Sequence, residues 1–340
     1  MRKNILHFTA FLLLFLVGLF LVSRLNLLYL RDPNNHEFNH EYFYELPENS
    51  VDVLIVGSSH SYCSFIPALL YEEYGISGYN LATSNQSMLA CYLWAKEAYE
   101  TQKYKVLVVE AMSVSNSHGD IENDIRSLNS MGLSPHYFEL MKTYKRQSLN
   151  VLFPVISFHQ SWDSITPASF RKTVYEDGDA MRGYVPLFST AGVENTTQIV
   201  DETDSTVGYL KYPYVDKLRE FCDENGIRLL FIKAPLANVE VNRWDTGMHN
   251  NLVQYTSQYN IPFWDFNAAS DAQLAGIQAS EDVAADGRHC NYSGAVKITR
   301  FLGKFLKEEW QISSAPGSFS EEALASYHRI IVLRSKNILR

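Results

Sequence analysis

The residues V-D-V-L-I-V-G-S-S-H, from Val51 to His60, decide the fold. An apolar, β-branched run that ends in a glycine is typical of a strand buried on both faces of a parallel sheet. The small polar residues that follow Gly57 are typical of a turn. We therefore expect an α/β domain that begins at about Val51 and whose first strand ends at this turn.

Short apolar runs and longer amphipathic stretches alternate along much of the remaining chain, which is typical of βαβ units. The later strands are expected at S-G-Y-N-L-A, K-V-L-V-V-E-A, R-L-L-F-I-K-A and Pro262–Asp265, and the helices at 67–74, 87–101, 213–225, 248–259 and 292–309. The predicted fold is α/β: a three-layer α/β/α, flavodoxin-like parallel sheet of about five strands over residues 51–312.

Two segments depart from this alternation. Residues 113–208 are expected to be either an insertion over the active-site edge or an ordinary set of surface helices and loops, and the sequence favours neither. Residues 313–340 are expected to form a C-terminal tail with a last amphipathic helix, for which Ser318 and Glu321 would make a capping box.

The N-terminus contains nineteen residues, 5–23, without Asp, Glu, Lys or Arg. Such a helix nearly crosses a hydrocarbon core of about 30 Å. A cleavable signal peptide is the alternative, but this apolar stretch is longer than the apolar core of a usual signal peptide and lacks an A-x-A-like cleavage site. We expect an uncleaved transmembrane anchor, followed by a polar tether over residues 24–50.

The orientation of this anchor depends on its flanking charges. Arg2 and Lys3 on one side are matched by Arg24 and Arg31 on the other, and the free amino terminus favours a cytoplasmic tail at residues 1–4. The protein is therefore expected at the cell membrane, single-pass, with its catalytic domain extracytoplasmic.

Composition excludes some functions. The chain has 340 residues, is 46% hydrophobic and carries a net charge of −9, which argues against nucleic acid as a partner. Cys63, Cys91, Cys222 and Cys290 show no C-x-x-C spacing, so no zinc site and no cofactor is expected. Free thiols are the favoured state, although disulfides could form outside the cell.

Ser59 is the candidate nucleophile. It follows Gly57, which is expected to allow a sharp turn at the carboxyl end of the first strand, where open parallel sheets bind ligands. Gly-Ser-Ser alone is more often plain turn chemistry. A serine also needs a histidine oriented by a carboxylate, and D-G-R-H supplies Asp286 and His289 before the last helix of the domain. His60 adjoins Ser59 and is expected to point elsewhere.

The stretches V-L-I-V-G-S-S-H-S and D-G-R-H-C-N-Y-S-G-A resemble the first and last blocks of the SGNH (GDSL-like) hydrolase superfamily. The resemblance is to its membrane-anchored branch, which includes the D-alanyl-lipoteichoic acid biosynthesis protein and the alginate O-acetylation proteins, and it spans about residues 51–306. It implies that Ser59 is the nucleophile and that Asp286 and His289 complete a catalytic triad.

Three positions depart from the pattern of this family. Ser58 stands where many members have aspartate, and Glu110 ends the third strand where the family has Gly-x-Asn-Asp. Asn85 stands at the glycine of the second block. Its N–H is expected either to join that of Ser59 in an oxyanion hole or, alternatively, Asn85 only caps the helix that begins near Ser87.

These features predict a serine esterase or O-acyltransferase that acts on acyl groups of an extracytoplasmic glycan or cell-wall polymer, with a membrane protein as acyl-transfer partner. The alternative is a non-catalytic glycan-binding or assembly protein that keeps the fold. A metal site built from His60, His289 and Asp286 has no recognisable ligand spacing.

Overall fold

The computed structural model describes residues 2–31, 40–115, 119–170, 178–192, 213–237 and 243–336. In this part of the chain, five parallel strands form one sheet in the order β2-β1-β3-β4-β5. The strands are β1 (Val53–Gly57), β2 (Gly78–Ala82), β3 (Val106–Glu110), β4 (Arg228–Lys233) and β5 (Phe263–Asp265). The predicted flavodoxin-like order is confirmed.

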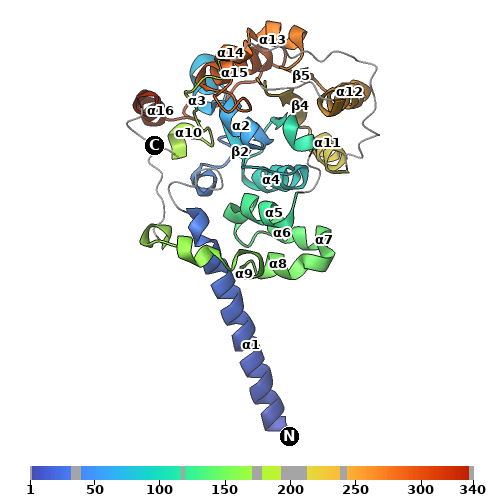
Figure 1. Cartoon of the computed structure of the whole chain (residues 1–340), viewed down its shortest axis with the longest axis vertical. Coiled ribbons are helices and arrows are strands. Elements are labelled where there is room, and N and C mark those ends of the chain that lie inside the picture. Colours follow the sequence, from blue (N-terminus) through green and yellow to red (C-terminus); the bar gives the residue numbers. More distant parts are fainter. Residues whose placement is uncertain are drawn as a thin grey trace.

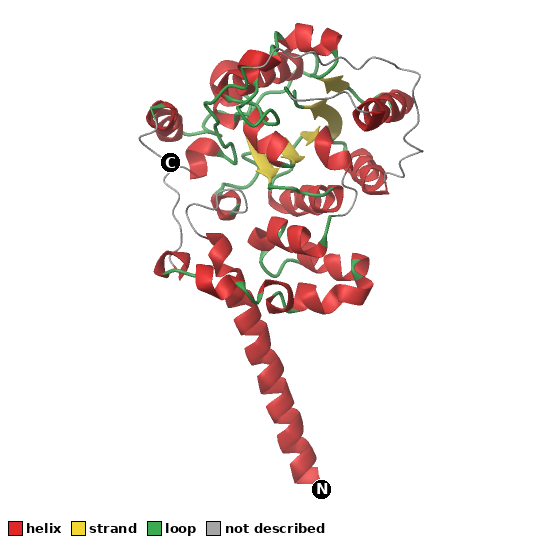
Figure 2. Ribbon diagram, viewed as in Figure 1, coloured by secondary structure: helices red, strands yellow, loops and turns green. Residues whose placement is uncertain are grey.

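Helices cover both faces of this sheet (Figures 1 and 2). One face packs against α4 (Met88–Thr101), α11 (Pro213–Asn225) and α12 (Arg243–Gln258), and the other against α2 (Ser59–Ser64), α3 (Pro67–Tyr74), α13 (Ala269–Ala275), α14 (Ala279–Asp282) and α15 (Tyr292–Glu308). Along β1, Leu54 and Val56 join the core on the α4 side, while Val53 and Ile55 join the core on the α15 side. This double burial explains why the strand is apolar throughout.

The expected helices form close to their predicted bounds, and local sequence explains their ends. Pro67 occupies the first turn of α3, and Gly75 ends that helix with a left-handed φ of 65°. Asn291 caps α15 by accepting a hydrogen bond from the N–H of Gly294. The helix α12 begins at Arg243, five residues before the predicted start at 248.

Within residues 113–208, the described part is a series of short helices. They are η4 (Ala111–Ser115), α5 (Ile121–Ser127), η5 (Asn129–Met131), α6 (Pro135–Phe138), α7 (Leu140–Thr143), η6 (Lys145–Gln147), α8 (Ser148–Leu152), α9 (Val155–Phe158), η7 (Ser161–Ser164), η8 (Pro167–Phe170) and α10 (Gly178–Met181). The helices α5 and α6 pack on α4, and α9 packs on the end of α1 (Figure 1). Residues 116–118, 171–177 and 193–208 of the expected insertion lie outside the described residues.

The N-terminal helix α1 (Arg2–Leu25) is exposed over most of its length and is long and apolar enough to cross a membrane. It continues into η1 (Asn26–Arg31), and η3 (Glu41–Glu45) follows. The description of residues 24–50 as an unpacked tether does not hold for the described part, because Leu27, His40 and Phe43 are buried. The Nε2–H group of His40 donates to the carbonyl oxygen of Ala82 at the end of β2, at 2.9 Å, and the His40 ring packs on Trp94. Residues 32–39 are outside the described part.

The C-terminal tail contains the expected helix, α16 (Glu321–Ser335), which packs on α3 and α10. Its cap differs from the prediction: Ser320, not Ser318, accepts a hydrogen bond from the N–H of Ala323. The Ser318 hydroxyl instead donates to the carbonyl oxygen of Ala315. All four cysteines are buried as thiols, and none of them forms a disulfide.

Candidate active site

The first strand delivers Ser59 to the carboxyl edge of the sheet. Gly57 is the last residue of β1, and α2 begins at Ser59. Gly57 does not have a positive φ, so the expected conformational freedom does not explain why a glycine occupies this position. A Cβ atom at Gly57 would instead lie 2.7 Å from the Cβ atoms of both Glu110 and Ser61. Glycine at this position therefore lets α2 and β3 approach the strand end closely.

Asp286 and His289 lie on a tight loop before α15. The Oδ1 atom of Asp286 accepts hydrogen bonds from the backbone N–H groups of Arg288 (2.9 Å) and His289 (3.1 Å), and Oδ2 lies 2.6 Å from Nδ1 of His289. Gly287 allows this turn because its φ is 71°. Burial opposes ionisation of Asp286, but the hydrogen bonds from His289 and from these N–H groups outweigh it and lower the pKa of the carboxyl.

The histidine joins the two ends of the domain. Its Nε2 atom lies 2.8 Å from Oγ of Ser59, although the two residues are 230 positions apart in sequence. An ionised Asp286 at Nδ1 favours the tautomer with the proton on Nδ1, which leaves Nε2 free to accept the serine proton. The structure thus brings together all three residues that the sequence singles out, in the order hydroxyl, imidazole, carboxylate.

Residues 185–191 brace the loop that carries the histidine. Ser189 Oγ accepts from the N–H of Ala285 at 3.1 Å, and the Ser189 carbonyl accepts from the side-chain amide of Asn291 at 3.2 Å. The N–H of Tyr292 donates to the carbonyl of Leu187 at 2.6 Å. The described part of the expected insertion therefore has two positions: residues 178–192 border this loop, whereas 119–170 pack around α4 and α1.

His60 also belongs to the site, contrary to the expectation that it points elsewhere. Its ring centroid lies 4.9 Å from that of His289, at an interplanar angle of 34°. Its Nδ1 atom lies 3.2 Å from Oγ of Ser58, and its buried Nε2 atom has no hydrogen-bond partner among the described residues. Burial, followed by the nearby charge of His289, lowers the pKa of His60 to about 3. It is therefore a neutral ring packed against the candidate base.

Asn85 lies in a turn at the same edge, because Ala82 at the end of β2 pairs with Gly57 at the end of β1. It is exposed and has a left-handed φ of 53°. The alternative that it caps the following helix is wrong, because the cap of α4 is Ser87, whose Oγ accepts from the N–H of Ala90. A contribution of its N–H to an oxyanion hole stays a prediction.

Buried hydrogen bonds hold this turn in place. The N–H of Gln86 donates to the carbonyl of Thr83, and the Gln86 side-chain amide donates to the carbonyl of Leu81 at 3.0 Å. The Thr83 hydroxyl lies 2.6 Å from the Ser127 hydroxyl of α5. The helices that follow β3 therefore support the turn that carries Asn85.

Three ionisable side chains that the sequence analysis did not assign lie fully buried at the ends of β3, β4 and β5. They are Glu110, Lys233 and Asp265. Burial raises the pKa of Glu110 to about 7. Burial also opposes ionisation of Asp265, but Lys233, at 3.6 Å, and His249, at 2.9 Å, lower its pKa to about 2. A charged residue that ends an otherwise apolar strand is the one sequence signal that could have drawn attention to them.

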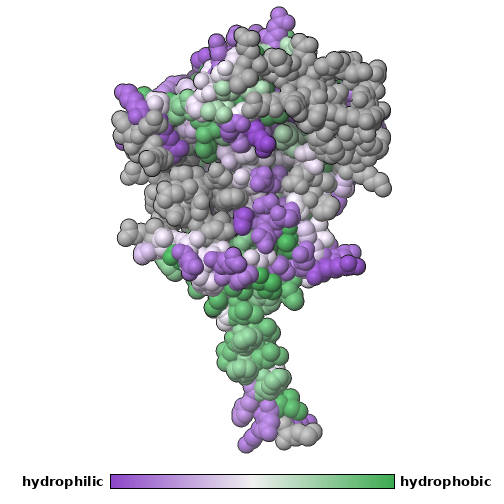
Figure 3. All heavy atoms as spheres, viewed as in Figure 1, coloured by the Kyte–Doolittle hydropathy of each residue, from purple (hydrophilic) through white to green (hydrophobic). Residues whose placement is uncertain are grey.

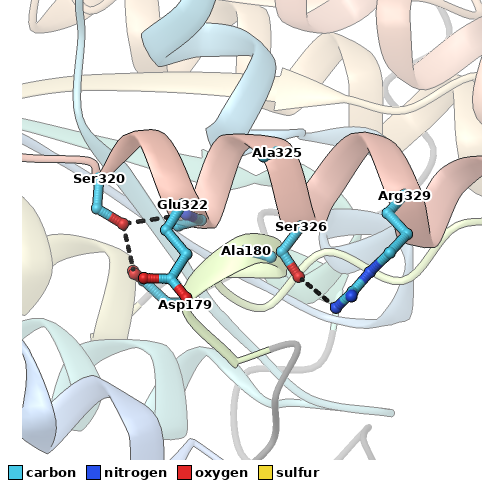
Figure 4. Close-up of a pocket in the computed structure, with 8 residues that line it drawn as sticks. Asp179, Ala180, Ser320, Glu322, Ala325, Ser326 and Arg329 are labelled. Atoms are coloured by element: carbon cyan, nitrogen blue, oxygen red, sulfur yellow. Dashed lines mark hydrogen bonds between the residues drawn. The ribbon is translucent and has the colours of Figure 1, made fainter.

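A separate hollow of about 550 Å³ lies between α10 and α16 (Figure 4). Asp179 of α10 faces Ser320 and Glu322 at the start of α16, and Ser326 and Arg329 line its other end. None of the three residues of the Ser59 site lines it. Among the described residues, no group of three or more His, Cys, Asp or Glu side chains is arranged to hold a metal ion.

No protein-family model and no curated protein matches the chain. Among solved structures, one from Desulfitobacterium hafniense, named for the G-D-S-L family of lipolytic proteins, is similar at 11% identity with a TM-score of 0.36; the match covers 74% of this chain and 97% of that one. One from Bacteroides fragilis, named as an acylhydrolase, is similar at 10% identity with a TM-score of 0.38, over 82% and 97%. The function of this chain is therefore inferred from the contacts of its own residues.

Proposed function

We propose that the protein is a membrane-anchored serine esterase or O-acyltransferase that acts on acyl groups of an extracytoplasmic glycan or cell-wall polymer. One observation carries the chemistry: Ser59 Oγ, the His289 imidazole and the Asp286 carboxylate form a continuous chain of contacts of 2.8 and 2.6 Å. A serine hydroxyl becomes a useful nucleophile when such a base is held in this way.

In the first half of the reaction, Nε2 of His289 takes the proton of Ser59 as Oγ attacks the carbonyl carbon of the ester. The resulting tetrahedral oxyanion needs donors, and the backbone N–H groups of Ser59 and Asn85 are our candidates. The bond to the alcohol then breaks, and His289 returns its proton to the leaving oxygen. An acyl group remains on Ser59.

In the second half, an acceptor hydroxyl gives its proton to His289 and attacks the acyl carbon, after which Ser59 leaves and is reprotonated. Water as the acceptor gives hydrolysis, and a sugar hydroxyl gives transfer. Asp286 keeps the imidazole oriented in both halves and stabilises its positive charge. A partly exposed Ser59, with a partly exposed His289 beside it, leaves room for either acceptor.

The proposed location follows from α1. Its length and apolar composition suit a membrane span, and the positive charges of Arg2 and Lys3 suit a cytoplasmic position for the residues before that span. The domain would then act outside the cytoplasm, where it could receive acyl groups from a membrane protein.

A serine-directed fluorophosphonate tests the nucleophile on the purified full chain. The wild type is expected to form one covalent adduct, and Ser59→Ala is expected to lose it and to lose kcat on a small acetyl ester by about 10⁴-fold or more. Ser58→Ala is the matched control, because it removes the neighbouring hydroxyl and should still be labelled.

Mass spectrometry after incubation with an acyl ester then separates the two reactions. An acyl-serine whose release is accelerated by added sugar, with acylated sugar as product, indicates transfer; release that ignores sugar indicates hydrolysis. A folded wild-type protein with no adduct and no ester cleavage would reject catalysis and favour the glycan-binding alternative.

A further inference from the structure

The last turn of α1 and the start of η1 are packed into the domain. Ser23 and Asn26 are fully buried, and the side-chain amide of Asn26 donates to the carbonyl oxygen of Phe158 at 2.5 Å. The Arg24 guanidinium donates to the carbonyl of Gly132 at 3.2 Å and stacks over the ring of Tyr137. The helix therefore enters the domain as part of its packing, without a free tether between them.

The length of α1 outside the domain determines how far the domain lies from a membrane that α1 crosses. The stretch from Ile5 to Val22 contains no fully buried residue and would span about 27 Å at 1.5 Å per residue. A bilayer has a hydrocarbon core of about 30 Å. If α1 spans a membrane, the first buried residue, Ser23, lies where the hydrocarbon core meets the lipid headgroups, and so does the surface around it.

That surface exposes large apolar side chains. Five large apolar side chains around the junction are exposed, between 40% and 65%: Leu133, Leu149, Ile156, Trp162 and Phe170. They belong to the short helices α8, α9, η7 and η8, or to the loop beside Gly132, and these segments pack against α1, η1 or one another. Figure 3 shows apolar atoms at the base of the domain, where α1 leaves it. We call these five residues the base face.

A short basic segment adjoins the base face. Lys142 of α7 and Lys145 and Arg146 of η6 are exposed and directly precede α8, which carries Leu149. They stand out in a chain whose net charge is −9. An apolar surface bordered by Lys and Arg, with an exposed tryptophan, is the composition that favours the interface of a membrane with anionic lipids.

We propose that the base face docks on the bilayer that α1 crosses, with Trp162 and its apolar neighbours among the headgroups and Lys142, Lys145 and Arg146 on anionic lipids. This inference rests on the proposed membrane anchoring. Two attachments, one helix and one surface, fix the tilt of the domain. Ser59 begins α2, and Figure 1 shows α2 on the far side of α4 and α5 from this base, so the site is then held at a constant height above the membrane.

Tryptophan quenching by brominated phospholipids tests the docking. The full chain is reconstituted in vesicles of phosphatidylcholine and phosphatidylglycerol, with bromine on the upper part of the acyl chains. We expect the bromolipid to quench part of the wild-type emission and this part to disappear in Trp162→Phe. Trp310→Phe is the matched control, because Trp310 packs against Phe305 of α15 and its removal should leave the quenched part intact.

A second variant tests for a gain of quenching, so that the inference does not depend on a loss of quenching alone. Leu149→Trp in the Trp162→Phe background should restore quenching, because it places an indole elsewhere on the base face. Flotation of the same vesicles reports the anchor independently. Protein that floats but shows the same quenching with and without Trp162, and none from Leu149→Trp, overturns the docking while leaving the anchor intact; protein that does not float rejects the anchoring itself.

Discussion

At the scale of single residues, the ring of His60 packs against that of His289, the candidate base. A second imidazole 4.9 Å from His289 would repel the charged form of the base if it were itself charged. Burial prevents this, because it lowers the pKa of His60 to about 3. The uncharged His60 ring therefore limits sterically how far the His289 ring can rotate away from Ser59.

We predict that His60→Ala lowers kcat by about 10- to 100-fold, because the imidazole of His289 gains room to leave the line between Asp286 and Ser59. His60→Phe should retain most of the activity, since it keeps a flat ring of similar size. Steady-state ester hydrolysis by the two variants provides the measurement. Equal losses in both would show that the ring nitrogens matter and would contradict a steric role.

The sequence predicted Ser59, His289 and Asp286 as site residues, but not the residues that surround them. Asp286 and His289 are neighbours in sequence, and their spacing alone puts both on one loop. His60, in contrast, meets His289 only because β1 and the loop before α15 reach the same edge, and no local pattern carries that contact. Glu110 was noticed only as a departure from a family motif, and its burial depends on α2 packing over Gly57.

At the scale of elements, Gly57 links the strand to the site. A side chain there would enter the space shared by Glu110 and Ser61, at 2.7 Å from each Cβ atom. Ser61 belongs to the same short helix as Ser59, so a shift of this helix moves Ser59 as well. The packing at the end of β1 therefore also sets the contact between Ser59 and His289.

We predict that Gly57→Ala destabilises the protein by about 1 to 3 kcal/mol through overpacking and lowers labelling of Ser59 by the fluorophosphonate. Urea unfolding gives the first quantity. Gly78→Ala is the control at a strand position where the nearest atom to a new Cβ, Leu70 Cδ2, lies at an ordinary 3.4 Å. The steric account fails if the two variants unfold at the same urea concentration.

Elements with a clear period were predictable, and short ones were not. The strands and the long helices α4, α11 and α15 appear within a few residues of expectation, because each has a continuous apolar face or run. The helices α6 to α9 have four or five residues each, too few to show a helical period. Their positions, with α6 on α4 and α9 on the end of α1, follow from tertiary packing, and the same packing makes the described part of residues 24–50 belong to the domain.

At the scale of the whole molecule, stability depends on pH through buried groups that the fold holds in one protonation state. Glu110 is fully buried, and its Oε1 atom accepts from the backbone N–H groups of Met112 and Ala234 at 3.2 and 3.4 Å. Its Oε2 atom has no hydrogen-bond partner among the described residues. These bonds do not offset burial, which raises the pKa from 4.5 to about 7. The native state therefore prefers Glu110 protonated.

The sign of the effect follows from linkage. Between about pH 4.5 and pH 7 the native state holds a proton that the unfolded state has released, so the contribution of Glu110 to stability is lost as the pH rises through this window. We predict that Glu110→Gln removes this loss, which is about 3 kcal/mol for a pKa raised from 4.5 to about 7. His40 and His60, whose lowered pKa values give the opposite slope, are present in both proteins and cancel in the comparison.

Urea unfolding of the wild type and Glu110→Gln at several pH values across this window gives the difference in the free energy of unfolding. It should grow in favour of the variant as the pH rises and then level off above about pH 7. Glu48→Gln is the matched control, because it removes one carboxylate from an exposed position. A constant difference between Glu110→Gln and the wild type at every pH would mean that Glu110 titrates alike in both states, and the carboxyl at the end of β3 would then be ionised beside the Ser59 site.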